Sequence, residues 1–100
     1  MVKVNWTREA IENIHELREH FEPRSLRYAE QLTDQIFEKA EILIQFTQIG
    51  RVVPEIDNPA IRELIYKSYR IIYTILTEDK IDILAVHNGL RPLSDISIFD

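Results

Sequence analysis

The spacing of the hydrophobic residues changes midway along this chain, and that change limits the folds that it can adopt. Between residues 10 and 43, apolar residues recur every three or four positions, which places them on one face of a helix. Between residues 61 and 87, β-branched and aromatic residues gather in short runs of the kind that favours strands. A chain that groups its helices and its strands in separate blocks is typical of an α+β domain.

Two helices are predicted in the first half. Thr7 and Ser25 are N-cap candidates, because their hydroxyls accept backbone N–H groups that a helix start leaves unpaired, and Pro23 ends the first helix. The apolar stripes after the two caps are Ala10, Ile14, Leu17 and Phe21, then Ala29, Leu32, Ile36, Ala40 and Leu43. We expect the first helix to end near residue 21 and the second to run for about 20 residues, with Gly50 as its C-terminal stop.

Four strands are predicted around this helical hairpin. Residues 2–6 alternate apolar and polar side chains, as a short half-buried strand does, with Trp6 in the core. Residues 50–59 hold glycine and proline and predict a loop. The three later runs, 61–66, 69–76 and 80–87, form a meander whose first turn centres on Lys67 and Ser68. The tail, RPLSDISIFD at 91–100, is expected to add a short edge strand or to dock loosely.

The predicted fold is therefore α+β with the order β-α-α-β-β-β, in which the helical hairpin packs on one face of a small, mainly antiparallel sheet. One hundred residues with 45% hydrophobic side chains suit a single domain over residues 1–100. We expect the opposite face of the sheet to be left for solvent or a partner.

Composition excludes several classes of function. The chain has no cysteine, which rules out disulfides and zinc–thiolate clusters, and its two glycines cannot form a phosphate-cradling loop. His15 and His20 are five positions apart, which on a helix separates them too widely for a zinc site of the H-E-x-x-H type. We expect no cofactor, no metal, no membrane segment and a cytoplasmic location.

A small cationic group is predicted on the uncovered face of the sheet. Arg62 and Arg70 fall on adjacent strands, while His87 and Arg91 lie at the end of the last strand and just past it. Arginine donates planar, permanently charged hydrogen bonds to a phosphate, and histidine exchanges protons near neutral pH. The same side chains also fit a structural role, paired with nearby carboxylates or backbone, and the net charge of −5 disfavours a polyanionic partner.

RNA cleavage by 2′-OH attack would give each of these groups a task. Arg70 and Arg91 would stabilise the charged phosphorane and His87 would protonate the leaving oxygen. The base would be Glu63 or a tyrosine, which the pattern does not identify. Tyr69 and Tyr73 share their alternation with Ile71 and Ile75, and we expect them to pack in the core.

Four motifs in order resemble a known family: GRVVPE at 50–55, IREL at 61–64, YRIIYTI at 69–75 and IDILAVHNGLR at 81–91. With the strand and helical hairpin before them, they resemble the RelE/ParE superfamily of type II toxin–antitoxin toxins, most closely its ParE plasmid-stabilisation branch. The family fold, two helices packed on a curved antiparallel sheet, is similar to the one that the periodicity predicts.

The resemblance implies a bacterial toxin that a small cognate antitoxin holds inactive, in assemblies that include a toxin–antitoxin heterotetramer. ParE-like members are reported to poison DNA gyrase, whereas RelE-like members cut mRNA on the ribosome. We expect a ParE-like toxin that inhibits growth by binding a macromolecule such as DNA gyrase. The alternatives are a metal-independent, RelE-like mRNA endonuclease and an inactive member that only binds antitoxin.

Site residues transfer from the family position by position. Arg70 falls on the family's sheet arginine, His87 or Arg91 on the basic position after the last strand, and Arg62 near a lysine pair of the nucleases. Leu64 replaces the second lysine, the tail lacks the terminal tyrosine of several nucleases, and the pI is about 5.2, all of which disfavour RNA cleavage. For antitoxin docking, the apolar candidates beyond the core stripes are Ile11, Ile44 and Phe46.

Overall fold

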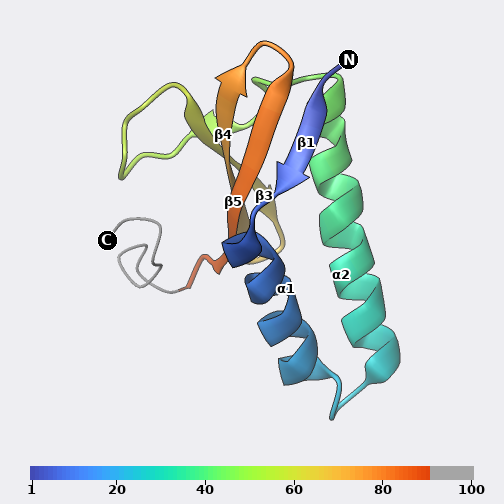
Figure 1. The fold of residues 1–100 in the computed structure, drawn as a ribbon. Coiled ribbons are helices and arrows are strands. Elements are labelled where there is room, and N and C mark those ends of the chain that lie inside the picture. The colour runs from blue at the N-terminus through green and yellow to red at the C-terminus, as the bar shows by residue number, and fades with distance from the viewer. Residues whose placement is uncertain (91–100) are drawn as a thin grey trace.

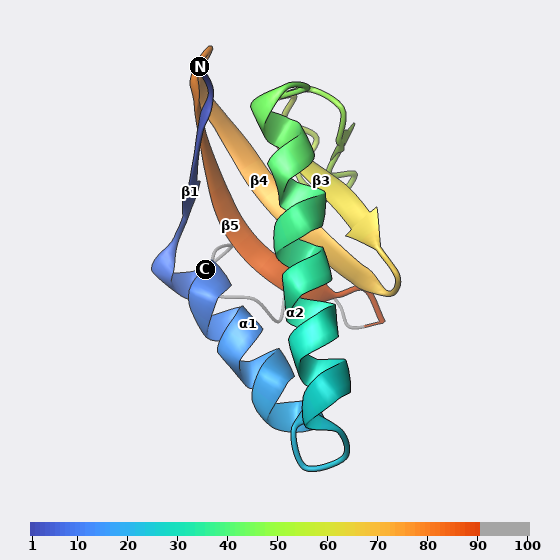
Figure 2. The same ribbon diagram turned by 90° about the vertical axis from the view of Figure 1, so that its right-hand side faces the viewer.

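Two helices pack against one face of a five-stranded sheet, as Figures 1 and 2 show from two sides. The computed structural model describes residues 1–90. The elements in chain order are β1 (Lys3–Trp6), α1 (Arg8–Phe21), α2 (Leu26–Glu41), the 3₁₀ helix η1 (Ile42–Ile44), β2 (Arg51–Val52), β3 (Ile61–Tyr66), β4 (Tyr69–Thr77) and β5 (Lys80–Asn88). The predicted α+β fold is confirmed; the expectation for the tail concerns residues 91–100 and lies outside the described residues.

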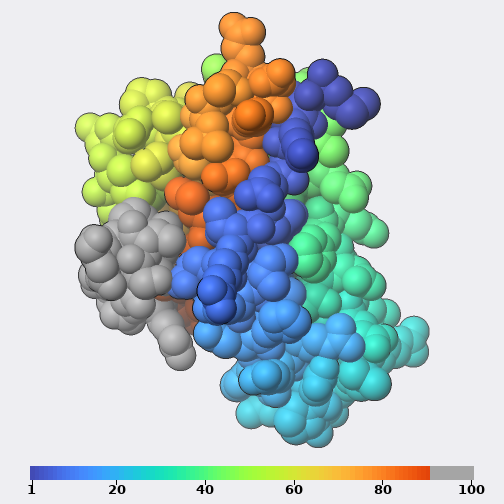
Figure 3. Space-filling view, in the orientation of Figure 1, coloured from blue at the N-terminus to red at the C-terminus, as the bar shows by residue number. Residues whose placement is uncertain are grey.

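The strand order is β1-β5-β4-β3-β2, so the first strand of the chain joins the last. β1 runs parallel to β5, with Val4 opposite Ile81, and every other pairing is antiparallel. β1 pairs only with the first part of β5. Farther along, the side chain of Asn13 in α1 accepts a hydrogen bond from the Val86 N–H at 3.0 Å. In the space-filling view of Figure 3, the blue N-terminal residues lie directly against the orange hairpin of β4 and β5.

Both predicted helix caps are present. The Thr7 hydroxyl accepts from the Ala10 N–H at 3.3 Å, and the Ser25 hydroxyl accepts from the Tyr28 N–H at 3.1 Å. Each hydroxyl satisfies one backbone donor that the first helical turn leaves unpaired. The five residues of the second predicted stripe are all 1% exposed or less: Ala29, Leu32, Ile36, Ala40 and Leu43.

The main core lies between the helices and the sheet. Its largest members include Ile36, Ile71 and Tyr73, none of which is exposed. Trp6 packs against this core, with its ring 4.5 Å from that of Phe37, as the alternation predicts. Tyr69 and Ile75 also contact it, so the predicted core-facing row of β4 is confirmed.

The second helix is shorter than predicted. It ends at Glu41, and the next three residues tighten into η1, which turns Leu43 into the core. Gly50 is therefore not a helix stop: its N–H donates to the Tyr73 hydroxyl at 3.0 Å. A Cβ atom at Gly50 would approach the Glu63 carbonyl oxygen to 2.7 Å, so only glycine fits where the chain passes this close to β3.

The predicted loop, 50–59, contains the short strand β2, and its apolar residues pack on the sheet. Val53 is fully buried against Ile72 and Ala85 on the sheet face opposite the helices, and Ile56 packs beside it. The expectation that this face is left uncovered is therefore wrong at this end, because the chain folds its own residues across it. We call this side of the sheet the outer face; it carries Glu63, Ile65, Arg70, Ile72, Ala85 and His87.

Candidate functional site

Arg62 and Arg70 lie on opposite faces of the sheet, contrary to the sequence prediction. The two-residue turn pairs Tyr66 with Tyr69, so an even-numbered residue of β3 shares its face with an odd-numbered residue of β4. Arg62 is consequently opposite Tyr73, on the helix side, and Arg70 is on the outer face. The guanidinium of Arg62 donates to the carbonyls of Pro59, Gly50 and Gln48 at 2.9, 3.0 and 3.3 Å. These bonds tie the segments before β2 and before β3 to the sheet.

Arg70 meets a buried carboxylate on the outer face. Its Nε donates to one oxygen of Glu63 at 2.5 Å, and the Nε of Arg51 donates to the other oxygen at 2.5 Å. The Glu63 side chain has no exposed surface. The Glu63 carboxylate bonds to both guanidinium groups and so offsets the repulsion between their charges.

Glu55 completes the arrangement from the segment after β2. Its two oxygens accept from Nη1 and Nη2 of Arg70 at 2.8 and 2.9 Å, a paired geometry that is strong for arginine and carboxylate. This pairing with Arg70 lowers the pKa of Glu55 to about 2. The same bond, followed by those from Glu63, raises the pKa of Arg70. We call Arg51, Glu55, Glu63 and Arg70 the ionic cluster; its formal charge is zero.

Of the two other residues predicted for RNA cleavage, the structure describes the position of one. His87 lies directly opposite Arg70 in the sheet register, as that interpretation requires, but only 4% of it is exposed. Arg91 lies outside the described residues.

Glu63, Tyr69 and Tyr73 are poor candidates for the base. Both oxygens of Glu63 already accept arginine N–H groups. Tyr69 and Tyr73 face the helices, and burial raises the pKa of each phenol, which disfavours the basic phenolate form. Around Arg70, the described residues therefore show a cluster of paired charges and no free general base.

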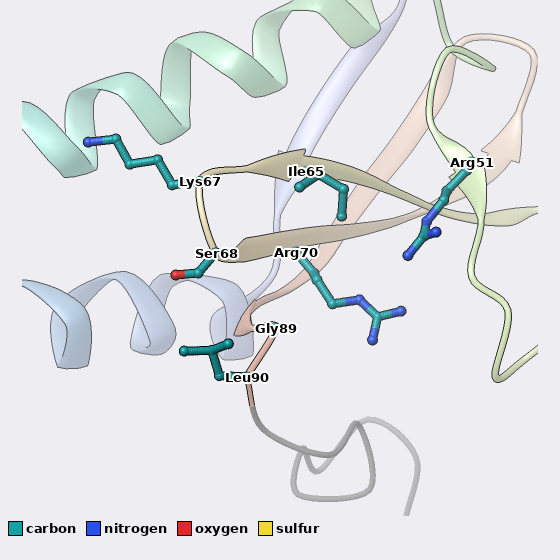
Figure 4. Close-up of a pocket in the computed structure, with 7 residues that line it drawn as sticks. All are labelled: Arg51, Ile65, Lys67, Ser68, Arg70, Gly89 and Leu90. Atoms are coloured by element: carbon teal, nitrogen blue, oxygen red, sulfur yellow. The ribbon is translucent and has the colours of Figure 1, made fainter.

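A shallow hollow of about 280 Å³ opens beside the ionic cluster. Its lining residues are Arg51, Ile65, Lys67, Ser68, Arg70, Gly89 and Leu90. Figure 4 shows the side chains of Arg51 and Arg70 reaching toward each other, while Lys67 extends away toward the helices. The ammonium of Lys67 lies over the rings of Tyr28 and Tyr66, 5.4 and 5.6 Å from their centres. The cationic part of the hollow therefore consists of the two arginines.

Sequence reasoning missed Arg51 and Glu55. Both belong to the GRVVPE motif, which carried the family resemblance but was assigned to a loop without chemistry. The signal was available in the charge pattern, because a strand arginine such as Arg70 on a partly buried face needs a carboxylate near it. Pairing Arg51 with Glu63 across β2 and β3 supplies the geometry.

A second feature is a run of exposed apolar side chains after α2. Ile44, Phe46 and Ile49 are 40, 56 and 51% exposed. Ile11, the third residue predicted for partner binding, is half-buried on α1. Exposed apolar side chains that form one continuous patch are a feature of surfaces that receive another protein.

Within residues 1–90, no group of three or more acidic or histidine side chains is arranged to hold a metal ion. No helix in the same range combines the length and the hydropathy needed to cross a membrane.

Comparison with known proteins defines the class. Residues 4–92 match the family model described as "ParE toxin of type II toxin-antitoxin system, parDE". The match spans most of the chain, so this is a type II toxin by class, and it belongs to the ParE toxin family. The predicted resemblance is thereby confirmed.

Solved structures agree on the fold. The chain is similar to one from the "Chromosomal ParDE TA system from P. aeruginosa", with a TM-score of 0.73 and 21% sequence identity. The similarity covers 88% of this chain and 96% of that one. A search of curated proteins finds no match.

Proposed function

We propose that this ParE-family toxin arrests growth by binding DNA gyrase, and that a cognate antitoxin neutralises it. The observation that carries the proposal is the state of Arg70. Glu63 and Glu55 together accept hydrogen bonds from all three of its guanidinium nitrogens. The positive charge of an arginine engaged in this way is already offset by two carboxylates, which weakens the stabilisation that it could give to the phosphorane of RNA cleavage.

Long-range electrostatics support a protein target over RNA. The ionic cluster contributes no net positive charge, and the chain as a whole carries −5. A protein that cuts messages on the ribosome works among closely spaced phosphates, where its own negative charge reduces the rate of association. Binding to a protein such as gyrase has no such requirement.

Antitoxin binding is proposed at the exposed apolar side chains Ile44 and Phe46, together with Ile11. Burying apolar surface is the main favourable term in most protein associations, and two of these side chains are 40 and 56% exposed. The similar structure is named as part of a ParDE TA system, which supports an antitoxin as the partner. We further propose that the toxin and its antitoxin assemble as a heterotetramer.

One observation favours the RelE-like alternative. The register places Arg70 opposite His87, so a cation and a proton donor are neighbours on β4 and β5. Their use as a nuclease would require Glu55 to leave Arg70 and His87 to become accessible. Such an enzyme would still need Arg91 or another cation.

Expression in a bacterial host tests the proposal. We expect the chain alone to arrest growth and the product of the neighbouring reading frame to relieve the arrest. During arrest, plasmid supercoiling should fall while primer extension shows intact messages. Cleavage in codon register would assign the RelE-like function. Absence of arrest would assign the inactive, antitoxin-binding alternative.

The variant His87→Ala sharpens this test. If gyrase binding causes the arrest, this variant should remain toxic as long as circular dichroism shows that it folds. Loss of toxicity with an intact fold would support the nuclease instead.

A further inference from the structure

Glu55 holds the outward edge of Arg70 in the way an incoming carboxylate would. Its oxygens accept from Nη1 and Nη2 at 2.8 and 2.9 Å, which is the geometry in which guanidinium recognises carboxylate. The Glu55 side chain is 47% exposed, whereas Glu63 has no exposed surface. An anion arriving from solution therefore competes with Glu55 for Arg70 and leaves Glu63 in place.

The backbone on both sides of Glu55 is fixed independently of this ion pair. Val53 is fully buried and Ile56 packs beside it on the outer face. The Val53 carbonyl also accepts from the N–H groups of Ile56 and Asp57 at 3.1 and 2.9 Å. Because these anchors flank Glu55, rotation about its side-chain bonds is enough to move the carboxylate away from Arg70.

The surroundings of Arg70 indicate which anion fits. Arg51 borders the same hollow, and its side chain is 60% exposed. Ile65 and Leu90 also line the hollow and are 48 and 84% exposed. The fixed negative charge of Glu63 behind the arginines disfavours a polyphosphate. A single carboxylate next to an aliphatic side chain matches both the cationic and the apolar parts.

We propose that Arg51 and Arg70 form a binding site for an acidic side chain of a protein partner, and that Glu55 occupies this site in the unbound protein. The partner's carboxylate takes the place of Glu55 on Arg70, and a neighbouring aliphatic side chain covers Ile65 and Leu90. Glu55 competes from within the chain, so it weakens the site for every partner that must displace it. This inference goes beyond the proposed function, since it requires neither gyrase nor a particular antitoxin.

Peptide binding to the full-length chain tests the site. The probe is a fluorescently labelled Leu-Glu-Leu tripeptide with its C-terminus amidated, measured by anisotropy, and the same peptide with glutamine is the control. We expect the Glu55→Ala variant to bind the glutamate peptide about threefold more tightly than the unmodified chain does, because an intramolecular competitor has been removed. Glu38→Ala, which removes an exposed carboxylate from α2, is the matched control and should change nothing.

A second substitution locates the binding. Adding Arg70→Lys to Glu55→Ala keeps a positive charge for Glu63 but removes the paired donors, and should reverse the gain. If that double variant does not fold, Arg51→Lys in the Glu55→Ala background carries the same expectation at the 60% exposed position.

Three results would overturn the proposal. The first is an affinity of Glu55→Ala equal to that of the unmodified chain, and the second is an equal gain for the glutamine peptide. The third is a larger gain for a 5′-phosphorylated dinucleotide than for the glutamate peptide, which would assign the site to nucleic acid.

Discussion

The two faces of the sheet are stabilised in different ways. The helix side is an apolar core of fully buried residues such as Ile36, Ile71 and Tyr73. The outer face has a small apolar cluster around Val53 and, beside it, the ionic cluster built on Glu63. Both faces bury residues of β3 and β4, but within residues 1–90 only the outer face buries a carboxylate, that of Glu63.

The difference separates what holds the fold from what is available to a partner. A partner cannot replace the contacts of the apolar core one at a time, because a core side chain that moves loses all of its packing contacts together. An ion pair at the surface can be exchanged for another of similar free energy, because the incoming anion replaces the bond that is broken. The outer face therefore offers recognition chemistry that the helix side cannot.

The largest contrast is expected from truncating one isoleucine on each face. Ile36→Ala should lower the free energy of unfolding by about 3–4 kcal/mol, because Ile36 has no exposed surface and leaves a cavity. Ile65→Ala, at a position 48% exposed, should cost about 1 kcal/mol or less. Urea denaturation followed by circular dichroism measures both. Equal losses would mean that the outer face is packed as the helix side is.

Removing the buried charge should have the next largest effect. Glu63→Gln leaves two arginine Nε groups facing a neutral amide and should cost about 2 kcal/mol. The estimate is below the usual range for a buried pair, because Arg51 is largely exposed and Arg70 keeps Glu55. Glu38→Gln on α2 is the control and should change stability by less than about 0.5 kcal/mol. A variant as stable as the unmodified chain would show that the ionic cluster adds nothing to stability.

Tyr73→Phe tests the polar contact at the edge of the apolar core. The hydroxyl accepts from the Gly50 N–H at 3.0 Å and donates to the Thr47 carbonyl at 2.9 Å. Its loss leaves two backbone groups unpaired and should cost about 1–2 kcal/mol. Tyr28→Phe, at an exposed ring, is the matched control with a change below about 0.5 kcal/mol. If the two variants lose the same stability, the Tyr73 hydroxyl does not fix the segment before β2.

The smallest effect is expected from titrating Glu55. Its pKa in the folded chain is about 2, below the usual 4.5, so the carboxylate stabilises the fold above pH 4.5 and loses this contribution as the pH falls toward 2. The side chain is 47% exposed, and solvent screening keeps the contribution below about 1 kcal/mol. Glu55→Gln should be less stable than the unmodified chain at pH 7, with the gap closing between pH 4.5 and 2. A gap that does not depend on pH would contradict the ion pair.

Sequence periodicity predicted the helix side well because its signal is local. Each buried residue of the second stripe, such as Leu32, follows the last by three or four positions, and the caps lie beside the helices that they start. The spacing could not show where α2 tightens, because apolar residues continue through Ile44 after the helix ends at Glu41.

The outer face was harder to predict because its contacts join distant segments. Glu55 and Arg70 are 15 positions apart, and their contact depends on how the segment after β2 crosses the sheet. The face of Arg62 was within reach of the sequence: a two-residue turn at Lys67 and Ser68 already fixes which residues of β3 and β4 share a side. The error came from following alternation along each strand without the register between them.

A supercoiling assay with purified components tests the central claim most directly. DNA gyrase, relaxed plasmid and ATP are incubated with increasing amounts of the full-length chain, and a parallel reaction contains ribosomes stalled on a defined message. If the toxin acts on gyrase, supercoiling falls with added chain while the message stays intact. Undisturbed supercoiling together with message cleavage that His87→Ala abolishes would contradict this claim.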